Sequence, residues 1–492
     1  MPDHIDLSSR SLAKLFAWLD PLPMPPGGLF LVGGSIRDLL MGRPLKDLDL
    51  ICRNALAFAR LTAETHGACF VPLGRDHDPP SFRVVHAQDH ENFLDITELA
   101  GPNISADLAR RDFTANALAL RLDISGPEVI DPFHGADDIR KGLLRHVKPS
   151  AFQNDPLRIL RGFRLRAQLN WNIEPNTLQT MAAVAPMLAG TAGERAAAEL
   201  RLILECPAAH QAVGEMMQVG ALEVLFPEMS AMRGCAQNRY HHLDVLDHCL
   251  AALRNCEAML AEPTALFKDL TAAVLADLSG WRLPWLKLAV LLHDVGKPGT
   301  CGLNPRTGQA TFYGHDALGA RMAGEAARRL RLSAAQGAFL AGLIRHHLHV
   351  GAMLAPQATE KARLRLLRRL GPDVIPATLL CLADTQAARG PANAPDHYQI
   401  TQEQGIRLIL DSLGRAEKIL AAPALISGHD LIRLGMEPGP KLGRMLKIVR
   451  EAQDVGEIKD RQEALRLAKK IVGQISMTPS DASGSRKSGK QL

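Results

Sequence analysis

The apolar pattern of the sequence changes from strand-like to helical near residue 150. Before this point a buried-strand pattern occupies 29–34 (LFLVGG), and polar and apolar residues alternate over 47–52, 92–97 and 118–123. After it, Leu, Ala and Arg recur at helical spacing between short Gly/Pro turns. We therefore expect a multidomain protein in which an α/β part is followed by an all-α part.

The length and composition indicate a soluble protein of two or three domains. A chain of 492 residues exceeds what one core supports, and the 47% apolar and 22% charged residues are ordinary for a globular protein. The net charge of +5 permits a polyanionic partner. The eight cysteines are scattered without a C-x-x-C pair, which indicates reduced thiols. No apolar run suits a signal peptide or a membrane span, so we expect a cytoplasmic protein without a membrane partner.

Two glycines, an arginine and two aspartates surround the end of the first strand. Gly33 and Gly34 open a helix, where backbone N–H groups can approach a phosphate closely, and Arg37 adds a cation one turn later. Asp47 and Asp49 lie two residues apart on the next strand and therefore share one face. Such a pair suits Mg²⁺ that is shared with substrate phosphates, although each feature alone is more often an ordinary turn or strand end.

A second polar pair lies where the helical part begins. Asp155 and Arg158 are three residues apart at a helix start, and this spacing predicts that they project from one face. A carboxylate acceptor and a guanidinium donor together can satisfy the Watson–Crick edge of a base, whereas the plain alternative is an intrahelical ion pair. Arg161 continues the same helix and is expected to face phosphate.

Histidines and aspartates recur at the ends of apolar helical segments in the all-α part. Imidazole and carboxylate groups in this setting suit a divalent metal, which would activate water for attack on a phosphate ester. A single such histidine is usually a core or surface residue, but seven positions in a fixed order indicate a site. The candidate ligands are His248, His293, Asp294, His315, His346, His347 and Asp384.

Four blocks of the sequence resemble the tRNA nucleotidyltransferase and poly(A) polymerase family, and they occur in the family's order. The blocks are 31–50 (LVGGSIRDLLMGRPLKDLDL), 110–120 (RRDFTANALAL), 131–147 (DPFHGADDIRKGLLRHV) and 155–169 (DPLRILRGFRLRAQL). The resemblance implies a polymerase β-like α/β head and a helical neck and body of the bacterial class. It also implies Mg²⁺-dependent, template-independent transfer of CMP and AMP from CTP and ATP to the tRNA 3′ end.

The resemblance assigns roles to individual residues of the head and neck. Asp47 and Asp49 are implied as the catalytic metal ligands, and Asp95 falls where the family often has a further acidic residue, although a strand-edge aspartate is as often structural. The implied nucleotide-binding residues are Gly33, Gly34, Arg37, Asp38, Arg111, Asp112, Asn116, Asp155, Arg158 and Arg161.

Two of these assignments are more specific. Arg111 and Asp112 are implied to recognise the ribose, and Asp155 with Arg158 to select the base in place of a template. The family usually has Glu before this aspartate, whereas Asn154 stands here and removes a charge beside Arg158. Asn154 is also a candidate helix N-cap.

The segment HDVGKP (293–298) and the order of the helical ligands resemble the HD metal-dependent phosphohydrolase superfamily. His315, His346 and His347 would complete a second metal site or bind phosphate. The metal is expected to be a divalent ion such as Ni²⁺, Co²⁺ or Mn²⁺. The implied first ligands are His248, His293, Asp294 and Asp384.

The leading hypothesis is a CCA-adding tRNA nucleotidyltransferase with an additional HD phosphohydrolase activity. Narrower alternatives are CC addition alone, A addition alone or poly(A) synthesis, and an alternative of another class is a phosphohydrolase whose head only binds RNA. The intact Asp47 and Asp49 argue against the last. The oligomeric state is left open.

The expected parts are a catalytic head (1–147), a nucleotide-selecting neck and body (148–230), an HD domain (231–395), a tRNA-binding helical tail (396–475) and a disordered end (476–492).

The paired carboxylates lead to a first prediction. Replacing Asp47 or Asp49 by Ala should reduce nucleotide incorporation by at least about 1000-fold, because phosphoryl transfer depends on metal-mediated charge stabilisation. Folding and RNA binding should stay nearly unchanged. Incorporation of labelled CTP and ATP measures the effect, and near-normal incorporation by the purified double variant would refute the assignment.

Overall fold

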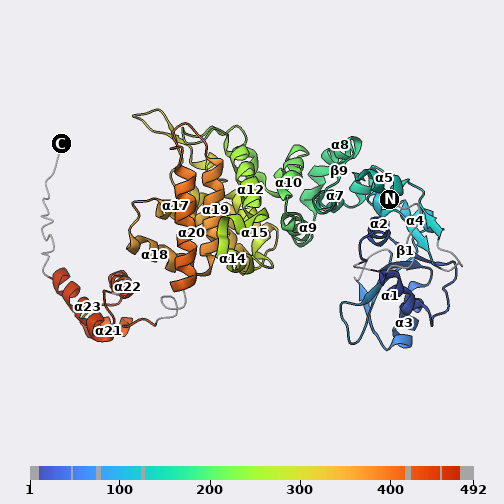
Figure 1. Cartoon of the computed structure of the whole chain (residues 1–492), viewed down its shortest axis with the longest axis horizontal. Helices are drawn as coiled ribbons and strands as arrows, with labels where there is room; N and C mark the ends of the chain where they lie inside the picture. The colour runs from blue at the N-terminus through green and yellow to red at the C-terminus, as the bar shows by residue number, and fades with distance from the viewer. Residues whose placement is uncertain are drawn as a thin grey trace, which may run out of the picture.

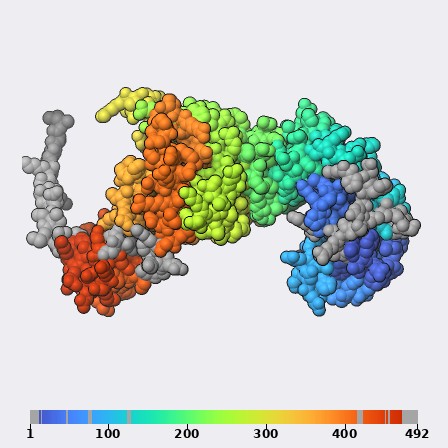
Figure 2. Space-filling view, viewed as in Figure 1, coloured from blue at the N-terminus to red at the C-terminus, as the bar shows by residue number. Residues whose placement is uncertain are grey.

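The chain forms an elongated arc with a sheet-containing head at one end and three small helices at the other (Figure 1). Figure 2 shows how the molecule narrows between the head and the large helical part. The expected architecture, an α/β head followed by all-α parts, is confirmed. The structure is a computed structural model that describes residues 10–45, 48–73, 79–122, 128–415, 423–454 and 457–476.

The head is built on a seven-stranded mixed sheet in the order β3-β4-β5-β2-β1-β6-β7. Its helices are α1 (Arg10–Leu19), α2 (Gly34–Leu40), α3 (Ala55–His66), α4 (Ile104–Leu108) and α5 (Gly135–Lys141), with a 3₁₀ turn η1 (Thr114–Asn116). Its strands are β1 (Leu29–Val32), β2 (Asp49–Cys52), β3 (Cys69–Leu73), β4 (Ser81–Val85), β5 (Phe93–Glu98), β6 (Ala119–Arg121) and β7 (Glu128–Ile130).

The central strand β1 is buried on both faces, which explains its unbroken apolar sequence. Leu29 and Leu31 join the main core cluster, whereas Phe30 and Val32 join a smaller cluster on the opposite face. The neighbouring strand β2 pairs antiparallel with β1 and parallel with β5, and the register places Asp49 opposite Asp95.

A helical neck and body follow the head, and helix α7 packs against both α9 and α10. A short parallel pair, β8 (Leu143–Leu144) with β9 (Asn172–Ile173), ties the end of the head to the neck. The helices are α6 (Ser150–Asn154), α7 (Leu157–Leu169), α8 (Pro175–Val184), α9 (Gly193–Glu205), α10 (Ala209–Gln218) and α11 (Ala221–Leu225), and the 3₁₀ turns are η2 (Ala185–Gly190) and η3 (Pro227–Met232).

The next part, here called the large helical domain, consists of α12 to α20. Its helices α15 and α19 lie at its centre, and most of their residues are apolar and buried, as expected for helices that are covered on nearly all sides. A small hairpin of β10 (Gly302–Leu303) and β11 (Ala310–Thr311) precedes α16. The helices are α12 (Val245–Ala261), α13 (Pro263–Phe267), α14 (Thr271–Asp277), α15 (Arg282–Leu292), α16 (His315–Arg329), α17 (Ala334–Leu354), α18 (Glu360–Leu370), α19 (Val374–Ala387) and α20 (His397–Arg415).

The tail consists of α21 (Gly428–Arg433), α22 (Pro440–Asp454) and α23 (Arg461–Ser476), which share a separate core. Helix α20 packs against α17 and α19, and its Leu408 and Ile409 belong to the main core. The expected boundary at 396 therefore falls before a helix of the large helical domain, and the separately packed tail begins after α20. Residues 477–492, expected to be disordered, lie outside the described residues.

Candidate active sites in the head and in the large helical domain

The turn between β1 and α2 brings three of the expected residues together. Gly33 has a φ of +74°, which side chains other than that of glycine rarely tolerate. A Cβ atom at this position would lie 2.8 Å from Nη1 of Arg111 and 3.8 Å from Oδ2 of Asp49. Glycine is therefore required both for the backbone conformation and for the close approach of a cation and a carboxylate. Asp47 lies outside the described residues.

A chain of polar contacts runs from this turn to the neck. Arg37 donates to Oδ1 of Asn116 at 2.8 Å and to Oδ1 of its neighbour Asp38 at 2.9 and 3.0 Å. Asn116 in turn donates to Oδ1 of Asp112 at 3.2 Å, and Oδ2 of Asp112 lies 3.2 Å from Nη2 of Arg161. The phosphate-binding candidate Arg37 and the neck residue Arg161 are thus connected through two side chains.

Asp112 is the buried centre of this chain, with 4% of its surface exposed. Burial alone would raise the pKa of its carboxyl group, but Arg161, Asn116 and the backbone N–H of Phe113 lower it. The carboxylate therefore holds its charge and orients Arg161 and Asn116. Its neighbour Arg111 lies 3.7 Å from Asp107 and near Gly33. Of Arg111 and Asp112, Arg111 is therefore the residue that lies at the β1–α2 turn.

Asp95 lies beside Asp49 but is held by another partner. The register of the parallel strands places the two aspartates opposite each other on one face of the sheet. Arg83 donates from Nε and Nη2 to the two oxygens of Asp95, both at 2.7 Å, and its guanidinium lies 4.0 Å from the centre of the Phe93 ring. Both oxygens of Asp95 are thus held by one guanidinium group, which agrees with a structural role for this aspartate.

The expected pair of Asp155 and Arg158 is arranged differently from the sequence prediction. Asp155 has φ −146° and ψ 96°, an extended conformation, and the helix α7 begins only at Leu157. The reason is Pro156, because the residue before a proline is disfavoured in the helical region. The two side chains therefore do not project from one helical face, and Asn154 is the last residue of α6 rather than the N-cap of α7.

Each member of the pair has its own partner. Oδ2 of Asp155 lies 3.0 Å from Nη2 of Arg195 at the start of α9. Arg158 donates to the carbonyl oxygens of Arg110 at 2.8 Å and Ala151 at 3.3 Å, and within the described part of the chain its buried Nε has no partner. Burial lowers the pKa of Arg158. Neither Arg195 nor these carbonyl contacts follow from the motif.

A cavity of about 1000 Å³ joins most of these groups, but Asp155 and Arg195 are not among the residues that line it. It extends from Gly33 and Asp49 along α7, which contributes Arg158, Arg161 and Arg164, to the segment 205–207 at the end of α9. The cavity is large enough for a nucleotide, and it has a carboxylate at one end and guanidinium groups along its wall.

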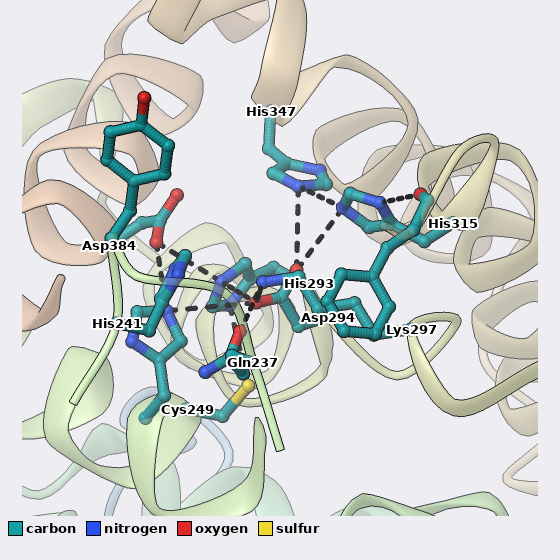
Figure 3. Close-up of polar contacts among 12 residues, drawn as sticks. Gln237, His241, Cys249, His293, Asp294, Lys297, His315, His347 and Asp384 are labelled. Atoms are coloured by element: carbon teal, nitrogen blue, oxygen red, sulfur yellow. Dashed lines mark hydrogen bonds and ion pairs between the residues drawn. The ribbon is translucent and has the colours of Figure 1, made fainter. Parts of the chain in front are cut away.

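The second site lies in the large helical domain, where five helices bring their ligand-type side chains to one point (Figure 3). His248 is on α12, His293 and Asp294 follow α15, His315 opens α16, His347 is on α17 and Asp384 is on α19. All but Asp384 are buried. The described residues thus form three overlapping groups in which the ligand atoms lie within 4.8 Å of one another.

Backbone carbonyls determine which nitrogen of three imidazoles is free for a metal. Nδ1 of His293, His315 and His347 lies 2.8, 2.7 and 2.6 Å from the carbonyl oxygen three residues earlier. Because a carbonyl only accepts, each Nδ1 carries the proton and each Nε2 presents a lone pair when the ring is neutral. Nε2 of His315 lies 3.2 Å from Nε2 of His347, an arrangement that a shared cation would stabilise.

Asp294 separates the cluster into two halves. Its Oδ2 lies 3.2 Å from Nε2 of His293 and 3.7 Å from Nε2 of His248, which itself is 2.9 Å from Asp384. Its Oδ1 lies 3.3 Å from Nε2 of His315. One carboxylate thus faces two sets of imidazoles, and together these side chains would be the ligands of divalent metal ions.

The charges in this cluster are strongly coupled. Burial alone would lower the pKa of His293, but the carboxylate of Asp294 raises it well above its usual value. Burial lowers the pKa of His347 to about 4, so that this ring is neutral at physiological pH. Lys297 lies 2.6 Å from Asp294 and 2.6 Å from Oε1 of Gln237, and Asp294 raises its pKa against the effect of burial.

One member of this cluster, His241, is not among the residues expected from the sequence, and one expected residue, His346, lies apart from the cluster. His241 forms a group with His248 and Asp384, and burial lowers its pKa to about 3. Its only signal in the sequence is its place in a histidine-rich stretch before α12. His346 is not in the cluster of the described residues, and its ring lies beside that of His349, 5.7 Å away. Neighbouring positions of a helix point about 100° apart, so only His347 faces the site.

Three protein families match successive parts of the chain. Residues 29–145 match the poly A polymerase head domain, and residues 245–388 match the HD domain. Between them, residues 170–232 match the family described as "Probable RNA and SrmB- binding site of polymerase A". Among the described residues there is no helix long and apolar enough to cross a membrane.

Curated relatives are similar to the chain over most of its length. An A-adding tRNA nucleotidyltransferase of Deinococcus radiodurans is 34% identical over 459 residues, which cover 92% of this chain and 97% of the relative. A CC-adding tRNA nucleotidyltransferase of Thermus thermophilus is 32% identical and covers 89% and 92% of the two chains. A multifunctional CCA protein of Nitrosococcus oceani is 31% identical and covers 75% and 86%.

Solved structures share the fold at lower sequence identity. A Thermotoga maritima CCA-adding enzyme complexed with tRNA aligns with a TM-score of 0.61 and 20% identity over 95% of this chain and 97% of the other. A complex of a CCA-adding enzyme with ATP aligns with a TM-score of 0.62 and 20% identity over 96% of each chain.

The two halves of the histidine cluster lead to a prediction about metal content. In an Asp49→Ala background, which removes a carboxylate of the head, the protein should retain about two Co²⁺ per chain after desalting. Asp294→Ala should lose both ions because its oxygens face both halves, and His347→Ala should lose only one. Elemental analysis by mass spectrometry measures the content. Unchanged cobalt in the Asp294→Ala variant would contradict a bridging role.

Proposed function

This chain belongs to the tRNA nucleotidyltransferase and poly(A) polymerase family, and we propose that it adds CMP and AMP from CTP and ATP to the 3′ end of tRNA. The chain is an enzyme of this family. The observation that carries the proposal is the cavity beside Asp49, because it joins a carboxylate, a glycine turn and a row of guanidinium groups. The named relatives and the tRNA-bound neighbour support tRNA as the acceptor.

The end of the cavity near β1 suits the triphosphate. Gly33 leaves room for a phosphate where a side chain would collide with Arg111. Arg37 is oriented by Asn116 and Asp38 before the substrate arrives, so that little side-chain entropy is lost on binding. The role of Arg37 and Arg111 is to hold the triphosphate. Because they act through charge, their contribution to binding does not depend on the base of the nucleotide.

The carboxylates of Asp47 and Asp49 fit Mg²⁺ by the chemistry of their donor atoms. Asp47 and Asp49 would hold the ion, and the oxygen donors of carboxylates and phosphates are those that Mg²⁺ prefers. When bound, such metals activate the attacking hydroxyl group and stabilise the leaving pyrophosphate. The task of the chain itself is to fix the relative position of triphosphate and acceptor, which α7 and the β1–α2 turn do from opposite sides.

Arg158, which lines the cavity, and Asp155 together suit bases that share one hydrogen-bond pattern. Cytosine and adenine both offer an amino donor next to an acceptor ring nitrogen, whereas uracil and guanine offer a carbonyl next to an N–H group. An acceptor from Asp155 and a donor from Arg158, whose Nε is unused, match the first pattern and oppose the second. One pair of side chains can therefore accept CTP and ATP and reject UTP and GTP.

A second candidate is addition of AMP alone. It is favoured by the A-adding relative of Deinococcus radiodurans, which this chain matches over 97% of that relative's length. Both candidates use the same cavity and the same metals, and they differ in whether CTP is a substrate and in which acceptor ends are extended.

We infer a separate phosphohydrolase activity for the cluster in the large helical domain. The buried imidazole and carboxylate donors fit a divalent ion such as Ni²⁺, Co²⁺ or Mn²⁺. The chemistry that such a metal supplies when bound is activation of water for attack on a phosphate ester. Lys297 is the cation beside the site that could hold the phosphate. Cyclic 2′,3′-phosphates, 2′-nucleotides and 3′-phosphates are the substrates to test.

The proposed reaction predicts how different acceptor ends are extended. Three tRNA transcripts that lack CCA, CA or A should all be completed when CTP and ATP are both present. Each transcript should first incorporate only the nucleotide that its end requires, as gel analysis with labelled CTP or ATP alone would show. Extension of the A-lacking transcript only would establish the second candidate. Failure with all three would support a head that only binds RNA.

The two sites should act independently. His293→Ala combined with Asp294→Ala should abolish the metal-dependent hydrolysis and leave nucleotide addition within about threefold of the parent, because these ligands lie outside the cavity of the head. Both activities are assayed on one preparation while Mg²⁺, Ni²⁺, Co²⁺ and Mn²⁺ are titrated. Loss of incorporation in a still-folded variant would show that the sites are coupled, and unchanged hydrolysis would show that the ligands are structural.

A further inference from the structure

The partner of Asp155 is an arginine that the motif does not contain. Arg195 lies 40 positions further along the chain, yet its Nη2 is 3.0 Å from Oδ2 of Asp155. The other oxygen, Oδ1, accepts from the backbone N–H of Leu157 at 3.3 Å. A carboxylate has about four acceptor positions, so both contacts together leave capacity for the amino group of a base.

The setting of Asp155 makes this contact important. Its extended backbone places it outside α7, so the helix does not orient its side chain as it orients Arg158. The preceding residue, Asn154, carries no charge. Asp155 is nevertheless close to Arg158 and Arg161, which line the cavity. Its charge partly offsets the lowering of the Arg158 pKa by burial and adds to the raised pKa of Arg161. Arg195 is therefore the side chain that holds the carboxylate of Asp155 near these two arginines.

Arg195 in turn is positioned by the large helical domain. It belongs to the first turn of α9, which begins at Gly193. A Cβ atom on Gly193 would lie 2.0 Å from the carbonyl oxygen of Arg329, the last residue of α16, so the two helix ends touch through their backbones. Glu194 pairs with Arg331 at 2.9 Å.

A further contact fixes the end of α16 on the body. Nη2 of Arg329 lies 2.7 and 2.8 Å from the two carboxylate oxygens of Glu228 in η3. The start of α9 is therefore held between its own domain and α16, and the residue next to this junction is the one that holds Asp155.

We propose that Arg195 is a positioning residue for nucleotide selection, which fixes the carboxylate of Asp155 near Arg158, a residue that lines the cavity, and is itself held by α16 of the large helical domain. The proposal rests on the proposed function, in which Asp155 accepts from the amino group of cytosine or adenine. A fixed acceptor opposes the carbonyl group of uracil, whereas a freely rotating carboxylate can turn away from it. Arg195 thus contributes to rejection of UTP more than to binding of CTP.

The first test is Arg195→Gln. The ratio of kcat/KM for CTP to that for UTP should fall about tenfold, the scale of one hydrogen bond to a charged group, while kcat/KM for CTP changes less than about threefold. The matched control is Arg233→Gln, because Arg233 makes an equally long ion pair of 3.0 Å with Glu223 and has a similar exposed fraction of 60% against 57%. The control should leave the ratio unchanged.

The second test addresses the junction with α16. Gly193→Ala should displace the start of α9 and lower the same ratio, because its methyl group would meet the backbone of Arg329. Gly190→Ala is the control, since nothing lies within 4 Å of a Cβ at Gly190. Thermal unfolding of each variant identifies any that is poorly folded, and in that case the result for Arg195→Gln decides alone.

Asp155→Ala, measured in parallel, separates this proposal from the proposed function. If Asp155→Ala keeps full discrimination, the selector itself is wrong. If Asp155→Ala loses discrimination and Arg195→Gln keeps it, only the role of Arg195 is overturned. An equal loss of kcat/KM for both nucleotides would show a structural role. A raised KM for tRNA with unchanged discrimination would show that Arg195 binds RNA phosphate.

Discussion

The buried carboxylate of Asp112 is the interaction on which the geometry of the transferase cavity depends. A charge with 4% exposure must be compensated by nearby donors, and here these are the N–H of Phe113, the amide of Asn116 and the guanidinium of Arg161. Asn116 also holds Arg37. The contacts of this buried carboxylate thus link the phosphate end of the cavity to helix α7.

The large helical domain uses buried charge differently. Its carboxylates Asp294 and Asp384 face a set of imidazoles whose Nδ1 protons are directed to backbone carbonyls, so that the lone pairs of Nε2 converge. In the head, Oδ1 of Asp112 accepts from the N–H of Phe113 and the amide of Asn116, and Oδ2 faces the guanidinium of Arg161, so that the charge is compensated by protein groups. In the helical domain the acceptors converge on one point, and the result is a candidate metal site. The continuous apolar core that joins the two parts allows both to coexist in one chain.

Much of this could be predicted from local patterns. The periodicity indicated the strands and helices. The paired glycines with Asp47 and Asp49 indicated one kind of chemistry, and the segment after α15 indicated the other. Other features depended on distant segments. His241 joins the cluster only because the stretch before α12 folds towards α19. A structural role for Asp95 is supported by the two hydrogen bonds that it accepts from Arg83 on the neighbouring strand, a contact that the sequence does not indicate.

The sequence by itself determined the family, the order of the parts and the chemical types of the functional groups, because these depend on residue identity and short spacing. It also contained the reason why Asp155 leaves the helix, namely Pro156. Only the tertiary structure decided which groups pair. Arg195 reaches Asp155, and the end of α16 reaches Gly193, through the packing of helices that are far apart in the chain. The partner of a side chain depends on the position and direction of two backbone segments. Residue spacing along one segment specifies the geometry of that segment alone.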